Sequence, residues 1–202
     1  MQNKSMLTRR RFAAGFALGS VALALPMPAF AFTAADAQQL IDKVVADANA
    51  SIASGKDVNG LIADFGRIFT RYADVPVIAR SVLGPAAKTA SPAQLAAFTK
   101  AYHSYVSAKY GRRFNEFKGG SITVIDTQPV KSYFEVATKV SLPGSTPFDV
   151  RWHVSNKSGK NLFFNIIIEG INMLTSERTE IGALLDKNKG NIDALIANLG
   201  SA

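Results

Sequence analysis

The chain has 202 residues, a formal net charge of +8 and no cysteine. The missing cysteines exclude disulfides, thiol nucleophiles and thiolate metal sites, so packing alone must stabilise the fold. No dense stripe of lysine and arginine occurs, which argues against nucleic acid as a partner. The chain has two histidines and no HExxH, GxSxG, P-loop or GxGxxG pattern. We expect no enzyme, no metal and no cofactor, although acid–base catalysis by aspartate or glutamate stays open.

Residues 1–31 have the organisation of an export signal. Thr8–Phe12 has the form of a twin-arginine motif, and an apolar run follows from Ala13 to Leu25. This run is about a dozen residues, which is shorter than the roughly twenty of a membrane span. Ala29–Ala31 resembles a cleavage site. We expect twin-arginine export to the periplasm with cleavage after Ala31, and the alternative is an uncleaved N-terminal anchor.

Loss of the signal would lower the formal net charge from +8 to +4, because the signal contains Lys4, Arg9, Arg10 and Arg11 and no acid. Residues 32–202 then suit one domain with a sizeable core. The remaining positive charge fits an anionic partner, such as lipid headgroups or an acidic protein surface. It fits an ordinary soluble surface equally well.

The first half of this domain has the periodicity of helices. Apolar residues recur every three or four positions over 40–52 and again over 58–72. Asp74 is the predicted N-cap of a short helix that Gly84 closes. Ser91–Gln94 has the pattern of a capping box with proline at the first helical position. The long helix that follows is predicted to end before Lys118-Gly119-Gly120.

The chain then changes to a period of two, which predicts strands. The alternation begins at Ile122 and continues through 132–140 and 147–155, and the run 162–168 is almost wholly apolar. Short turns join these segments, so we expect a four-stranded antiparallel meander. Helices at about 176–186 and 191–199 follow. The predicted fold class is α+β, with several helices around the apolar face of the sheet.

Helices on such a face can enclose an apolar cavity. The aromatic residues of the predicted inner faces fit either an ordinary core or the wall of a ligand site, because both share one pattern. We expect these faces to lack buried charge, since an unpaired buried charge is costly. Neither His103 nor His153 has an acid placed beside it by its spacing in the sequence, so catalysis by histidine is not predicted.

Five stretches in order resemble the MlaC-type periplasmic phospholipid-binding proteins, the toluene-tolerance auxiliary components of ABC transport. The stretches cover 72–84, 90–98, 105–110, 167–174 and 190–196. The resemblance implies an NTF2-like cone whose helices close over acyl chains, without catalytic residues or a cofactor. Where the family usually has a Tyr-Asp pair this chain has Phe164-Asn165, and Asn172 replaces a common serine. A polar contact that the family makes through the aspartate must therefore differ.

The resemblance also implies a function. Such a protein carries a phospholipid between an outer-membrane lipoprotein complex and an inner-membrane ABC transporter complex, and we expect a monomer. Lys and Arg at the rim would meet phosphate or an acidic partner, or form a solvated helix face; the candidates are Arg80, Lys109, Arg112 and Arg113. The alternatives are an NTF2-like enzyme that acts on an apolar substrate and a carrier of another lipid, such as a hopanoid.

The apolar pattern and the resemblance together give a candidate acyl-chain site in residues 32–202, the phospholipid-binding domain. We call its residues the predicted lipid wall: Val82, Tyr102, Tyr105, Val150, Trp152 and Ile168.

Overall fold

The computed structural model describes residues 32–200, and the predicted export signal lies outside them. The helices before the sheet are α1 (Ala34–Ala53), α2 (Val58–Tyr72), α3 (Val75–Leu83), the 3₁₀ helix η1 (Gly84–Lys88), α4 (Pro92–Gly111) and the 3₁₀ helix η2 (Arg112–Phe117). The strands are β1 (Ser121–Val130), β2 (Tyr133–Ser141), β3 (Phe148–Ser155), β4 (Leu162–Ile168) and β5 (Ile171–Asn172). Helices α5 (Met173–Lys187) and α6 (Ile192–Gly200) follow. The α+β class is confirmed.

The sheet is an antiparallel meander in the order β1-β2-β3-β4-β5. The prediction of four strands is wrong by one short strand, because β5 pairs with the end of β4 through Ile168 and Ile171. Glu169 and Gly170 both have a positive φ, of 49° and 81°. Two such residues in a row give the tight reversal of a two-residue hairpin, and the sequence signals only the glycine.

The predicted alternation of β3 is confirmed. Val150 and Val154 are buried, whereas Asp149 and Arg151 on the opposite face are exposed. The pairing of β3 with β4 shifts between His153 and Val154, because Val154 faces Phe163 whereas His153 faces Asn165. Phe164 is therefore an extra residue in β4, as in a β-bulge. This bulge explains why the apolar run 162–168 lacks a clean alternation.

The predicted helix caps are confirmed at two places. The side chain of Asp74 caps α3, and Ser91 and Gln94 form the capping box of α4. The long helix ends earlier than predicted, at Gly111, and continues as η2. A Cβ atom on Gly111 would lie 2.6 Å from the Cα atom of Ile62, so glycine permits the close approach of α4 to α2.

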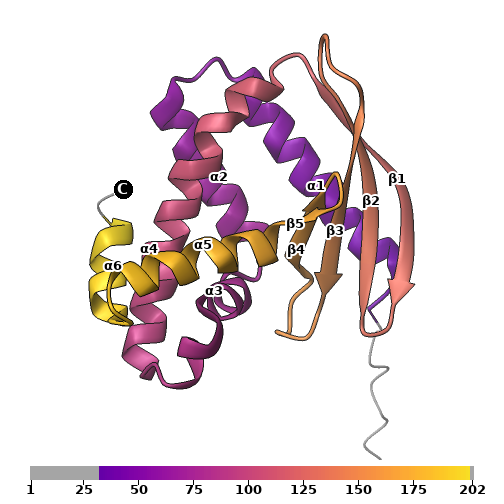
Figure 1. The fold of residues 1–202 in the computed structure, drawn as a ribbon. Coiled ribbons are helices and arrows are strands. Elements are labelled where there is room, and N and C mark those ends of the chain that lie inside the picture. Colours follow the sequence, from indigo (N-terminus) through magenta and orange to yellow (C-terminus); the bar gives the residue numbers. More distant parts are fainter. Residues whose placement is uncertain (1–31, 201–202) are drawn as a thin grey trace, which may run out of the picture. The chain divides into compact units, whose positions relative to one another are not determined.

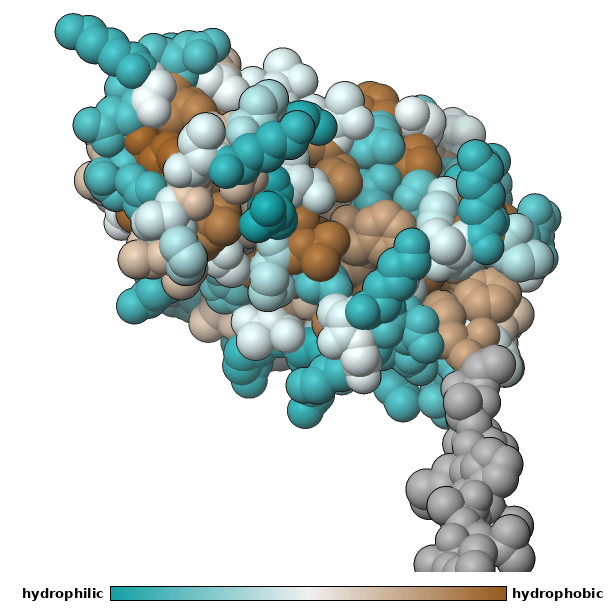
Figure 2. Space-filling model, turned by 90° about the horizontal axis from the view of Figure 1, so that it is seen from below, coloured by the Kyte–Doolittle hydropathy of each residue, from teal (hydrophilic) through white to brown (hydrophobic). Residues whose placement is uncertain are grey.

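The helices pack against one face of the sheet, with α1 crossing it and α5 running from β5 across α4 towards α6 (Figure 1). Between the layers lies a core of fully buried side chains, including Ile41, Phe98, Val136, Val154 and Ile181. On the face seen in Figure 2, apolar residues form small groups separated by hydrophilic ones. No helix within residues 32–200 is both long and apolar enough to cross a membrane.

Candidate functional site

The structure brings four residues of the predicted lipid wall into one apolar cluster. Val82 of α3 and Tyr102 of α4 are buried there, and Tyr105 and Trp152 pack against it half-buried. Val150 and Ile168 lie further along the same face of the sheet, where they are register partners in β3 and β4. The cluster therefore contains Val82, Tyr102, Tyr105 and Trp152, whereas Val150 and Ile168 share only the sheet face of Trp152.

A buried hydroxyl stands in the middle of this apolar face. Thr138 of β2 is fully buried, and its Oγ1 donates to the Val150 carbonyl oxygen at 3.0 Å. The same Oγ1 accepts a hydrogen bond from Trp152 Nε1 at 3.1 Å. This pair of bonds fixes the indole orientation and satisfies its polar atom inside the layer. The sequence places Thr138 on the correct face but gives no sign of this role.

The expectation of an inner face without buried charge is wrong where α5 meets α4. Glu177 of α5 is 4 % exposed, and its Oε1 accepts hydrogen bonds from Lys109 Nζ at 2.7 Å and from the Tyr110 hydroxyl at 2.5 Å. Glu180, one turn later, accepts from Lys109 and from the Tyr105 hydroxyl. We call these residues, with the adjacent Tyr102, the α4–α5 cluster. It includes two residues of the predicted lipid wall.

The ionisation of the α4–α5 cluster follows from burial and from its carboxylates. Burial and the hydrogen bond to Glu180 raise the pKa of Tyr105 to about 12. Burial and Glu177 raise the pKa values of Tyr102 and Tyr110. Burial lowers the pKa of Lys109, but the bonds to both glutamates outweigh it and the net pKa is raised. At neutral pH Tyr105 and Tyr110 are therefore neutral donors, and Lys109 is charged.

A second polar cluster lies on the opposite face of the sheet. His153 is 8 % exposed, and its Nε2 lies 3.2 Å from Glu135 Oε2. The register of β2 and β3 pairs these two residues, and spacing along the sequence gave no sign of it. Asn165 Nδ2 lies 3.3 Å from His153 Nδ1, while its Oδ1 accepts from the Leu174 N–H at 3.2 Å. Asn165 thereby ties β4 to the first turn of α5.

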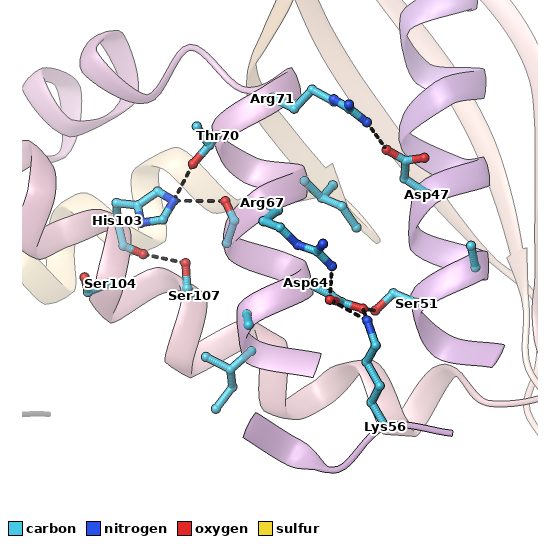
Figure 3. Close-up of a pocket in the computed structure, with 15 residues that line it drawn as sticks. Asp47, Ser51, Lys56, Asp64, Arg67, Thr70, Arg71, His103, Ser104 and Ser107 are labelled. Carbon is cyan, nitrogen blue, oxygen red and sulfur yellow. Dashed lines mark hydrogen bonds and ion pairs between the residues drawn. The ribbon is translucent and has the colours of Figure 1, made fainter. Parts of the chain in front are cut away.

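A hollow of about 890 Å³ lies along the helices α1, α2 and α4 (Figure 3). It contains none of the predicted lipid wall. Its charged groups are already engaged, because Asp64 pairs with Lys56 and Arg67, and Arg71 pairs with Asp47. His103 also lies here, with Nε2 2.8 Å from the Thr70 hydroxyl. We assign no ligand to this groove.

A further hollow of about 570 Å³ lies on the outer face of the sheet and includes Lys139, Arg151 and Ile167. It contains none of the predicted lipid wall either. Among the predicted rim cations, Lys109 belongs to the α4–α5 cluster, whereas Arg80, Arg112 and Arg113 are exposed. No three histidine, aspartate or glutamate side chains within residues 32–200 are grouped to hold a metal ion.

Comparisons with known proteins agree with this architecture. A phospholipid-binding protein from Ralstonia solanacearum, solved in complex with a phospholipid, superposes with a TM-score of 0.70 at 16 % sequence identity. The match covers 82 % of this chain and 95 % of that one, and it shows a shared fold. The sequence model of the family described as MlaC protein matches residues 38–201. Since that match spans most of the chain, the chain belongs to the MlaC family.

Proposed function

We propose that this protein is a phospholipid carrier and not an enzyme. The observation that supports it most is the apolar inner face of the sheet, formed by Val136, Val140, Val150 and Val154, over which the helices close. Membership of the MlaC family supports the same reading, as does the likeness to a protein solved with a phospholipid. The predicted lipid wall is the part of this layer that we assign to the acyl chains.

The energetics of acyl chains suit a carrier of this kind. Each methylene removed from water contributes about 0.8 kcal/mol, so two long chains supply ample affinity for an apolar interior. The same chains are unfavourable in water, so the carrier must enclose them while the headgroup stays near solvent. Membrane, carrier and transporter all offer apolar surroundings. The net free-energy change of each hand-over can therefore be small.

The route that we propose is periplasmic. The twin-arginine pathway exports the chain, cleavage follows Ala31, and the mature monomer moves phospholipid between an outer-membrane lipoprotein complex and an inner-membrane ABC transporter complex. The twin-arginine motif of Thr8–Phe12 supports the export step, and the family supports the partners. The pair His153 and Glu135 does not support the enzymatic alternative, because it lies on the face of the sheet opposite Trp152.

Lipid analysis of the purified mature protein tests this function. Native mass spectrometry should show one two-chained lipid bound to each monomer, and mass spectrometry of an organic extract should identify a phospholipid. A polycyclic lipid in the extract would instead support the hopanoid alternative. A protein that carries no lipid, and takes up none from phospholipid vesicles after delipidation, would refute the carrier function.

A further inference from the structure

The inner stripe of α5 contains a carboxylate where the helix pattern calls for an apolar residue. Leu174, Glu177 and Ile181 follow helical spacing and face the interior. Glu177 Oε1 has two donors, but Oε2 is buried and has no hydrogen-bond partner among residues 32–200. A buried acceptor without a donor is rare in folded proteins and calls for an explanation. The missing partner is a hydrogen-bond donor.

The surroundings of Glu177 favour a donor that is a cation. Lys109 Nζ already lies 5.6 Å from the ring centroid of Tyr105 and 5.4 Å from that of Tyr110, so the cluster surrounds an ammonium group with aromatic faces. Two glutamates and one lysine leave the cluster with a negative formal charge. A second ammonium group is therefore favoured, and an anion without a cation of its own is disfavoured.

The cluster also lies where the apolar layer meets the solvent. Tyr102 is buried in the same apolar layer as Val82, whereas the side chains of Lys109 and Glu180 are 28 % and 44 % exposed. The cluster thus runs from the predicted lipid wall to the solvent along the seam between α4 and α5. A headgroup held here would keep contact with water while its acyl chains lie in the interior.

We propose that the α4–α5 cluster is the headgroup subsite of the carrier and that Glu177 selects phospholipids with a primary ammonium group. This inference rests on the proposed carrier function. Glu177 Oε2 accepts a hydrogen bond from the lipid ammonium, and Lys109 pairs with the lipid phosphate while it keeps its bond to Oε1. The side chains along the seam between α4 and α5 move apart to admit the headgroup. A trimethylated ammonium has no N–H to donate, and phosphatidylglycerol has no cation.

Competition between lipids tests the subsite. Delipidated mature protein is incubated with vesicles of equimolar dioleoyl phosphatidylethanolamine, phosphatidylcholine and phosphatidylglycerol, reisolated, and its bound lipid is identified by mass spectrometry. We expect phosphatidylethanolamine to be enriched about tenfold over each competitor, as one charge-assisted hydrogen bond allows. Glu177→Gln should abolish the enrichment. Asp186→Asn, at an exposed position of α5 outside the cluster, is the matched control and should retain it.

A second measurement needs no variant, which matters if Glu177→Gln fails to fold. With phosphatidylethanolamine methylated once, twice and three times, binding to the wild-type protein should decrease and be lowest for the trimethylated lipid. Uptake of all headgroups in the vesicle ratio, or enrichment that persists in Glu177→Gln, would overturn the subsite while leaving the carrier function intact. Failure of the wild-type protein to take up any of the lipids would overturn both.

Discussion

The indole nitrogen of Trp152 donates a hydrogen bond to the hydroxyl of Thr138, at 3.1 Å, within the apolar face of the sheet. Thr138 is fully buried, and the two residues lie on neighbouring strands. The bond lets a large aromatic ring with a polar atom serve in an apolar layer without an unsatisfied donor. The orientation of Trp152, and with it the shape of the predicted lipid wall, depends on this hydroxyl.

Thr138→Val should destabilise the protein by about 1–3 kcal/mol, because it leaves the buried Trp152 donor without a partner. Urea unfolding of the mature protein measures the effect. Thr123→Val, at an exposed position of β1, is the control and should change stability little. Combining Thr138→Val with Trp152→Phe should cost less than the sum of the single changes, and simple additivity would contradict the pairing.

The alkaline titration of the α4–α5 cluster gives a second prediction. Tyr105 should stay neutral until its raised pKa of about 12. Since the pKa in the folded state exceeds the ordinary value of about 10, the stabilisation is complete below pH 10 and is lost as pH rises through 12. A pH titration followed by the ultraviolet absorbance of tyrosinate should show a component near pH 12 in the wild type. The same component should be missing in Tyr105→Phe. Titration of that component at the ordinary tyrosine pKa would contradict the assignment.

Low pH should also weaken the α4–α5 cluster, because Glu180 becomes protonated. The bonds from Lys109 and Tyr105 overcome the effect of burial and lower the pKa of Glu180. A lowered pKa means that the stabilisation is present above the ordinary glutamate value and is lost as pH falls through the lowered one. The pH dependence of stability in this acidic range should be reduced in Glu180→Gln. An unchanged profile would show that the pairing contributes nothing.

Asn165→Asp, which introduces the residue usual in the family, should change the state of His153. The amide of Asn165 donates to Nδ1, so the proton of a neutral ring sits on Nε2 and points to Glu135. An aspartate accepts only, so it favours a ring proton on Nδ1, where the amide of Asn165 excludes one. Nitrogen NMR of the ring should show a proton on Nδ1 in the variant. A single proton on Nε2 would contradict this account.

Export gives a prediction that depends on residues 1–31 alone. Arg9→Lys combined with Arg10→Lys should leave uncleaved precursor in the cytoplasm, because the arginine pair is the recognition element of the twin-arginine route. Cell fractionation measures the distribution, and Lys4→Arg, outside the motif, is the control. Normal periplasmic yield of the double variant would contradict twin-arginine export, and a mature N-terminus other than Phe32 would move the cleavage site.

The features that could be predicted from the sequence are those set by local interactions. Caps at Asp74 and Ser91 and the alternation around Val150 depend on neighbouring residues, and each was confirmed. The pair Glu135 and His153 could not be predicted, because it depends on the register between two strands. The fifth strand depends on a positive φ at Glu169, a conformation that its residue type does not favour.

The role of Glu177 was missed for a related reason. The last apolar run continues into α5 through Met173 and Leu174, so the sequence places the start of this helix about three residues too late. With the predicted start at 176, Glu177 belongs to a solvated first turn. The actual cap is Asn172, whose side chain accepts a hydrogen bond from the Thr175 N–H at 3.1 Å. Because the helix starts before Leu174, Glu177 lies on the same helix face as Leu174 and Ile181.

The assignment of the predicted lipid wall is the central claim, and a charge placed within it is the most direct test. Val150→Glu puts a carboxylate against the acyl chains, at a cost of several kcal/mol unless it reaches water. Ile167→Glu, on the opposite face beside Arg151, is the matched control. Trp152→Ala provides a second change within the wall that introduces no charge.

The measurement is the amount of phospholipid bound by each variant, together with its cooperative thermal unfolding. The account predicts that Val150→Glu keeps a cooperative fold but binds no phospholipid, that Trp152→Ala binds less, and that Ile167→Glu binds as much as the wild type. Full lipid occupancy in a stably folded Val150→Glu, or loss of its fold altogether, would contradict the claim that this face lines the lipid site.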